Sequence, residues 1–135
     1  MTRKLTSLLL LAGLVAACGD EMAPEEDHTP ATAKLYIGLN EITPAVGLTQ
    51  GQTVRIEVRF YAADGDLITG LEDHHFAALT FAPGTLATVV SVTSMPFFFD
   101  VTAQASAGTG TVTVGYGHEI DADELSFGPF IVTIQ

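Results

Sequence analysis

The sequence predicts an all-β fold, a sandwich of about seven or eight short strands behind a signal peptide and a flexible tether. Three observations predict it. Apolar and polar residues alternate with a period of two from Lys34 onward, as expected for strands with one buried and one wet face. Glycine-containing turns separate these runs at short intervals. No window after the signal peptide has the spacing of an amphipathic helix.

The clearest strand pattern covers residues 54–61, where four apolar residues alternate with Arg55, Glu57, Arg59 and Tyr61. β-branched and aromatic residues dominate this and the other runs, which pleated surfaces favour. The residues that share the core-facing side of each run are Leu35, Ile37 and Leu39; Val54, Ile56, Val58 and Phe60; Leu79 and Phe81; Leu86, Thr88, Val90 and Val92; Phe97, Phe99 and Val101; Val112, Val114 and Tyr116; and Phe130, Val132 and Ile134.

Four glycine-containing segments are expected to be turns, at residues 48–51, 63–66, 82–84 and 107–110. The Asp64-Gly65 pair gives the strongest of these signals, because this dipeptide favours the left-handed backbone of a tight hairpin. Short strands divided in this way are typical of a β-sandwich.

The charge balance argues against nucleic acid as a partner. The 135-residue chain has a net charge of −11, and every acidic residue follows position 17. Removal of residues 1–17 leaves only Lys34, Arg55 and Arg59 as basic residues, so the net charge becomes −13. A field of that sign repels phosphate backbones and anionic lipid headgroups.

The first eighteen residues have the three parts of an export signal. Arg3 and Lys4 precede an apolar run over residues 5–15, which is too short to span a bilayer core of about 30 Å as a helix. The run ends in Val15-Ala16-Ala17-Cys18, which resembles the lipobox of bacterial lipoproteins. The resemblance implies cleavage before Cys18, a diacylglycerol thioether on its sulfur, and acylation of the new amine by a fatty acid such as palmitate.

Cys18 is the only cysteine, so an intramolecular disulfide is excluded and lipidation accounts for the residue. The alternative is an ordinary secretory peptide with an incidental cysteine. The next residue is Gly19 rather than the aspartate that resembles an inner-membrane retention signal, which favours the outer membrane or cell surface. We expect the acyl chains to tie the protein to the membrane, and we expect no other cofactor.

Three segments follow from these patterns: a signal peptide over residues 1–17, a lipidated acidic tether over 18–33, and a β domain over 34–135. The tether has little apolar surface to bury, so it cannot offset the entropy of ordering. Its charged and proline residues are Asp20, Glu21, Pro24, Glu25, Glu26, Asp27 and Pro30.

Four pieces of the β domain resemble bacterial immunoglobulin-like domains of the invasin and intimin type. They are residues 47–54, 62–68, 86–89 and 107–114, in the order of that family. The resemblance implies a Greek-key sandwich that serves as a stalk, spacer or adhesive module, without catalytic residues and with another envelope or surface protein as partner. The histidines at 74, 75 and 118 and the acidic stretch 119–124 depart from the family pattern.

These departures from the family pattern suggest a second hypothesis, namely that the protein binds a divalent metal. Imidazole and carboxylate suit Zn²⁺ or another divalent transition ion. The candidate ligands are His74, His75, His118, Asp121, Asp123 and Glu124, with Asp73 nearby. Adjacent strand residues point to opposite faces, so only one of His74 and His75 is expected to join His118 unless both lie in a turn. The alternatives are a calcium loop at residues 121–124 and plain solvated loops.

An enzyme is not expected, because the chain lacks a G-x-S-x-G elbow and its one cysteine is assigned to lipid. One aromatic residue remains as a candidate contact. Alternation over residues 97–101 turns Phe98 outward, where it would either anchor a partner or lie under a loop or the tether.

Overall fold

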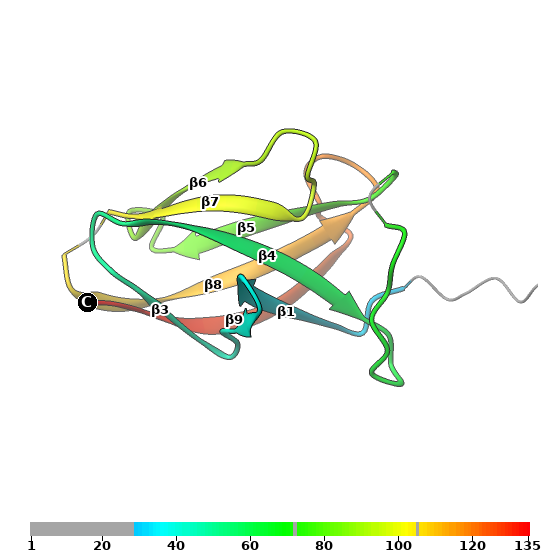
Figure 1. The fold of residues 1–135 in the computed structure, drawn as a ribbon, viewed down its shortest axis with the longest axis horizontal. Coiled ribbons are helices and arrows are strands. Elements are labelled where there is room, and N and C mark those ends of the chain that lie inside the picture. Colours follow the sequence, from blue (N-terminus) through cyan, green and yellow to red (C-terminus); the bar gives the residue numbers. More distant parts are fainter. Residues whose placement is uncertain (1–28, 72, 105) are drawn as a thin grey trace, which may run out of the picture.

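The computed structural model describes residues 29–71, 73–104 and 106–135, which fold into two layers of β-strands (Figure 1). The predicted signal peptide 1–17, the predicted lipidation site Cys18 and the predicted tether up to residue 28 lie outside the described residues. In the part that is described, the chain contains no helix long and apolar enough to span a membrane.

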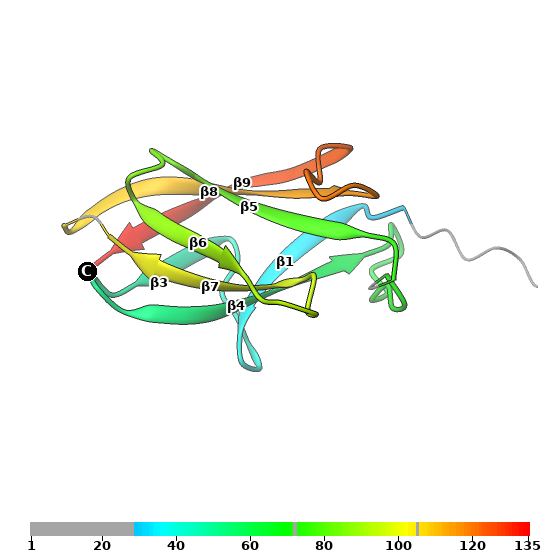
Figure 2. The same ribbon diagram turned by 90° about the horizontal axis from the view of Figure 1, so that it is seen from above.

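Within the described residues, nine strands make two sheets that pack face to face. Sheet A has the strand order β2-β1-β4-β7-β6, and sheet B has the order β3-β9-β8-β5. Figure 2 shows β8 and β9 on one side of the sandwich and β4 and β7 on the other. The strands are β1 (Thr32–Ile37), β2 (Asn40–Glu41), β3 (Ala45–Leu48), β4 (Thr53–Tyr61), β5 (Phe76–Ala82), β6 (Ala87–Ser91), β7 (Phe98–Ala103), β8 (Gly108–Gly117) and β9 (Leu125–Ile134).

The strand order is that of an immunoglobulin-like Greek key. Strands β1, β4, β7 and β6 correspond to one sheet of a constant-type domain, and β5, β8 and β9 to the other. The chain crosses between the sheets after β2, β3, β4, β5 and β7, and β3 forms one edge of sheet B by pairing parallel to β9. The predicted fold class, an all-β immunoglobulin-like sandwich, is confirmed.

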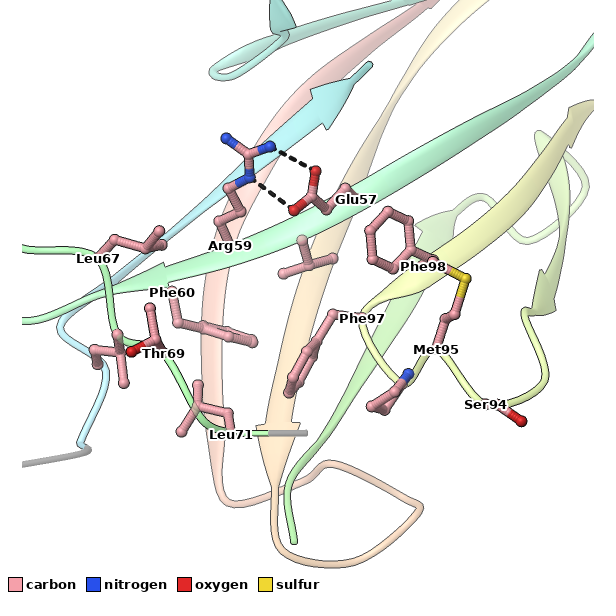
Figure 3. Close-up of a pocket in the computed structure, with 13 residues that line it drawn as sticks. Glu57, Arg59, Phe60, Leu67, Thr69, Leu71, Ser94, Met95, Phe97 and Phe98 are labelled. Carbon is pink, nitrogen blue, oxygen red and sulfur yellow. Dashed lines mark hydrogen bonds and ion pairs between the residues drawn. The ribbon is translucent and has the colours of Figure 1, made fainter. Parts of the chain in front are cut away.

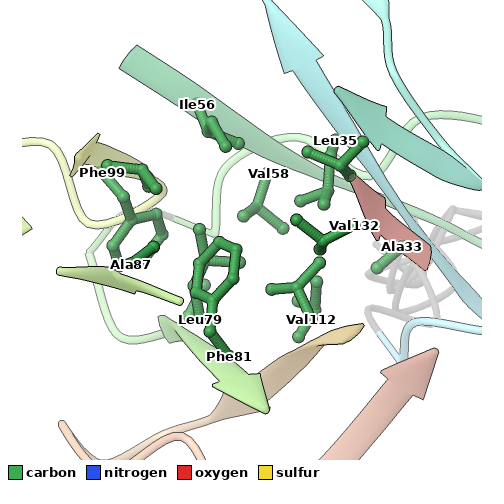
Figure 4. Packing of buried hydrophobic residues seen from close by; sticks show 14 of the residues in the cluster. Ala33, Leu35, Ile56, Val58, Leu79, Phe81, Ala87, Phe99, Val112 and Val132 are labelled. Carbon is green, nitrogen blue, oxygen red and sulfur yellow. The ribbon is translucent and has the colours of Figure 1, made fainter. Parts of the chain in front are cut away.

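Alternating side chains of the two sheets form the core (Figure 4). In β4, Ile56, Val58 and Phe60 are buried and Val54 is half-buried, as the alternation predicts. The same prediction is confirmed in β5, β7 and β8, and in β9 at Val132 and Ile134. Two inner faces whose apolar residues interdigitate over a common core are what hold a sandwich together.

Three of the predicted core positions, Leu39, Thr88 and Val90, are wrong. Leu39 is 91% exposed, because β1 ends at Ile37 and the chain turns at Gly38, whose φ is +61°. Val90 is 58% exposed, because the core-facing residue at the start of β6 is Ala87, so Thr88 and Val90 point outward. The turn before β6 buries two consecutive residues, Leu86 and Ala87, which shifts the alternation by one position.

The predicted turn at residues 107–110 is also wrong, since β8 already begins at Gly108. Gly110 is needed there for close packing rather than for a turn. A Cβ at this position would overlap the Leu86 side chain and the carbonyl oxygen of Ala82. Glycine inside a strand often marks such a close approach.

The predicted hairpin at Asp64-Gly65 forms, but its two arms are joined by a single β-bridge. Gly65 has a φ of +92°, and the amide of Ala62 donates to the carbonyl of Asp66 over 2.9 Å. Tyr61 then pairs with Leu67 in a single bridge before the chain leaves sheet A for β5. The domain itself starts two residues before the predicted position 34, because β1 begins at Thr32.

Candidate functional site

Two loops meet at one end of the sandwich, the right-hand end in Figure 1. One joins β4 to β5 and carries His74 and His75, and the other joins β8 to β9 and begins at His118. The pairing of β5 with β8 brings them together, since Phe76 lies opposite Gly117. The histidine before Phe76 is therefore placed beside the histidine after Gly117.

His75 and His118 form the centre of this end. Their imidazole rings are 4.3 Å apart between centroids and tilted by 50°. The ring of Tyr116 stacks on His75 from the core side, with a centroid distance of 5.3 Å and an angle of 16°. Only one of the two adjacent histidines joins His118, as expected, and it is His75; His74 is exposed. We call His75, Tyr116, His118 and Glu124 the histidine cluster.

Glu124 fixes the orientation of the His118 ring. Its two carboxylate oxygens lie 2.8 and 2.9 Å from Nδ1 of His118, and one of them accepts the backbone N–H of the same residue over 3.1 Å. The hydrogen bond from the His118 side chain lowers the pKa of Glu124 below its ordinary value. Burial, together with the charge of Glu124, raises the pKa of Tyr116.

The remaining predicted metal ligands do not converge with the histidine cluster. Asp73, Asp121 and Asp123 are exposed on the two loops. Across residues 29–71, 73–104 and 106–135, no three histidines, cysteines or carboxylates are grouped so that they could hold a metal ion. Of the six proposed ligands, the structure brings together His75, His118 and Glu124.

A second feature is a cleft of about 270 Å³ beside β4, which we call the β4 cleft (Figure 3). It opens where β4 continues past its last pair with β7, between the segments 67–71 and 94–98. Phe60 and Phe97 form its apolar floor, with ring centroids 5.7 Å apart and nearly perpendicular planes.

An ion pair lies at the rim of the β4 cleft. Arg59 donates from Nε and Nη2 to the carboxylate of Glu57 over 2.8 and 2.7 Å, and its guanidinium lies 4.2 Å from the centre of the Tyr36 ring. The hydrogen bonds from Arg59 to Glu57 raise the pKa of the guanidinium. Glu57 and Arg59 belong to the alternating pattern that predicted β4, but no sequence pattern indicated the cleft beside them.

Phe98 lies on the outer face of β7, as predicted, and lines the β4 cleft. It is half-buried rather than fully exposed, and Figure 3 shows it beside Met95. Met95, in the turn before β7, is 38% exposed. Phe98 is therefore covered in part by its own loop and keeps one side toward solvent.

No protein-family model matches the sequence, and a comparison with curated proteins finds no match. Among solved structures, the chain is similar to the crystal structure of domains 4 and 5 of the S-layer protein SbsC, with 17% identity and a TM-score of 0.44. The match covers 78% of this chain and 53% of the other, so this chain spans about half the length of that structure. A likeness at this level carries no argument about function.

Proposed function

We propose that the protein is a membrane-anchored envelope lipoprotein whose immunoglobulin-like domain is a non-enzymatic binding or structural module, either adhesive or a spacer. The observation that carries the proposal is the interior of the sandwich. No polar or charged residue is buried in the described part of the chain, where the buried side chains are apolar or tyrosine. Such an interior serves stability, and leaves any contact with other molecules to the surface and loops.

The place of action is inferred from the N-terminal sequence. The lipobox at residues 15–18 supports acylation of Cys18, and Gly19 supports the outer membrane or cell surface. Two or three acyl chains hold a protein stably at a bilayer, whereas one chain gives only reversible binding. The acidic domain would then be kept off anionic headgroups by charge repulsion.

The binding role favours another envelope or surface protein as partner. The β4 cleft supports this, because it combines an apolar floor with the Glu57–Arg59 ion pair at its rim. Anchoring side chains of protein partners commonly fill such small apolar hollows, and polar groups around them set the orientation. Phe98 and Met95 are the side chains through which the cleft would touch a partner.

Mass spectrometry of the protein extracted from its native membrane tests the anchor. We expect an N-terminal peptide that starts at Cys18 and carries the mass of a diacylglycerol thioether. A Cys18→Ser variant, which keeps the rest of the chain, should lose this mass and the cleavage. An unmodified Cys18 inside the purified wild-type chain would show that the protein is not a lipoprotein.

A second candidate function is divalent-metal binding at the histidine cluster. The Nδ1 atom of His118 faces the carboxylate of Glu124, and that of His75 lies 3.3 Å from the carbonyl oxygen of Leu71. Each Nδ1–H donating to an oxygen leaves the lone pair of the ring on Nε2, as in many histidines that bind metals. This favours two imidazole ligands, with water completing the coordination.

Calorimetric titration of the full chain with Zn²⁺ separates this candidate from the first. We expect heat and a rise in melting temperature that His75→Ala and His118→Ala abolish. His74→Ala is the matched control, because it removes the neighbouring exposed imidazole and should change nothing. The absence of both heat and thermal stabilisation in the wild type at millimolar Zn²⁺ would remove the metal function.

A further inference from the structure

The two sheets of the sandwich differ in charge. All six charged residues that lie in strands belong to sheet A, namely Lys34, Glu41, Arg55, Glu57, Arg59 and Asp100. The four strands of sheet B contain no aspartate, glutamate, lysine, arginine or histidine. In a chain with a net charge of −11, this leaves the strands of one whole sheet without charge.

The outward residues of sheet B form what we call the neutral face. One row crosses all four strands, because Ala45 pairs with Ile131, Ile131 with Thr111, and Thr111 with Ala82. Thr133 and Thr109 make a neighbouring row with Gly47, and Thr113 lies opposite Thr80. Ile131 is 60% exposed and is the largest side chain of the central row.

The sizes of the side chains on the neutral face are suited to packing against another sheet. The side chains of these two rows and of the Thr113–Thr80 pair are short or β-branched, so none of them projects far from the backbone, whereas Phe76 lies on the same face at the end of β5 next to the histidine cluster. Two such faces can approach to the spacing of stacked sheets, about 10 Å, with side chains of one lying between those of the other. The hydroxyl groups of the threonines can exchange hydrogen bonds with water for hydrogen bonds across the contact.

We propose that the occupant of the neutral face is a second copy of the same chain, packed sheet B against sheet B about a two-fold axis near Ile131. Charge argues for this partner. A basic protein gains nothing from an uncharged surface and is attracted instead to the acidic loops, such as the one with Glu119 and Asp121. A second acidic copy is repelled by those loops and meets no repulsion on the neutral face.

The geometry of the face agrees with the same partner. A two-fold contact uses one patch on both copies, so the patch must be complementary to itself. A surface of threonine, alanine and isoleucine without charges meets this condition, because no residue on it needs an oppositely charged group across the axis. The inference concerns the domain alone and does not depend on the lipid anchor.

The first test measures the mass of the full chain in mild detergent by light scattering across a concentration series. We expect a dimer for the wild type and at least a tenfold weaker dimer for Ile131→Asp, because the axis sets the two new carboxylates against each other. Val90→Asp is the matched control, since Val90 is 58% exposed in a strand of sheet A and should leave the dimer intact. Circular dichroism checks that both variants keep the β fold.

The second test places a thiol on each face of the protein in its native membrane. We expect a short bismaleimide to link Thr111→Cys into a dimer, and to leave Thr88→Cys, on the outer face of sheet A, as a monomer. The wild type, with Cys18 as its only cysteine, gives the background. A monomeric wild type in detergent overturns the proposal, and so does cross-linking of Thr88→Cys with equal yield, or equal weakening by Ile131→Asp and Val90→Asp.

Discussion

His75 and His118 come from different loops, yet their imidazole rings lie 4.3 Å apart because Phe76 and Gly117 are opposite each other in sheet B. The contact ties the loop between β4 and β5 to the loop between β8 and β9 at one end of the sandwich. Glu124 completes it from the second loop, with an oxygen 2.8 Å from Nδ1 of His118. This end of the domain therefore has a defined shape that depends on the state of one carboxylate.

Acidification should loosen the histidine cluster through Glu124. The folded state lowers the pKa of this carboxyl through its hydrogen bond with His118, so its contribution to stability is present above the ordinary pKa of 4.5. That contribution is lost as the pH falls through the lowered value, because the folded state then binds a proton too. We expect Glu124→Gln to unfold more easily than the wild type at neutral pH, with a difference that shrinks in acid.

The measurement is the denaturation midpoint of the wild type and of Glu124→Gln, taken from neutral pH to pH 3. Glu119→Gln removes the same charge from the same loop and serves as the control, since Glu119 is exposed and has no part in the cluster. A constant difference between Glu124→Gln and the wild type over the whole pH range would contradict the linkage to Glu124.

Gly110→Ala should destabilise the domain by about 1–3 kcal/mol, the usual cost of overpacking. The new methyl group would overlap the Leu86 side chain and the carbonyl oxygen of Ala82, and the latter belongs to backbone that cannot easily move. Gly47→Ala is the control, because nothing lies within 4 Å of a Cβ there. Urea denaturation of the two variants compares the costs, and equal midpoints would mean that β8 relaxes to accept the methyl group.

Tyr36 should ionise late in an alkaline titration. Its hydroxyl is 2.8 Å from that of Tyr61, and this hydrogen bond, with burial, raises the pKa of Tyr36 to about 12. A raised pKa means that the neutral phenol stabilises the fold below pH 10, the ordinary value, and that this stability is lost as the pH rises toward 12. Tyr61→Phe should bring the phenolate absorbance of Tyr36 to lower pH.

The matched control for the tyrosine titration is Tyr116→Phe. Tyr116 stacks on His75 and lies in sheet B, whereas Tyr36 and Tyr61 lie in sheet A, so the step near pH 12 should persist in this variant. If Tyr61→Phe left that step unchanged as well, the hydrogen bond between the two hydroxyls would not be its cause.

The alternation of residues along β4 was enough to predict its two faces, because each buried position is decided by its own side chain and the period of a strand. The same rule failed at Leu39 and Val90. Alternation does not tell where a strand ends or where a turn buries two residues in succession, and both depend on packing against other strands. Gly110 was misplaced for a related reason, since only the neighbouring Leu86 shows that this glycine gives room rather than a turn.

The candidate sites depend still more on contacts distant in sequence. Both histidines lie in the loop before β5 rather than in a strand, and the choice of His75 depends on the register of β5 with β8. The β4 cleft exists because β7 begins at Phe98, so that beyond Glu57 the neighbour of β4 on that side changes from β7 to the segment around Leu67. The neutral face could not be predicted from the sequence alone, because it depends on which strands belong to sheet B.

Phe60 links the core to the candidate sites, and its removal should be costly. Its ring meets Phe97 in the floor of the β4 cleft, and Tyr116 of the histidine cluster at 4.9 Å. Phe60→Ala should destabilise the domain by about 3–5 kcal/mol, through lost burial and the cavity left behind. Phe98 is half-buried across the cleft, so Phe98→Ala should lower the free energy of unfolding clearly less than Phe60→Ala does. Guanidinium denaturation gives both values, and a similar cost for the two would mean that the cleft rather than the core holds this end of the sandwich together.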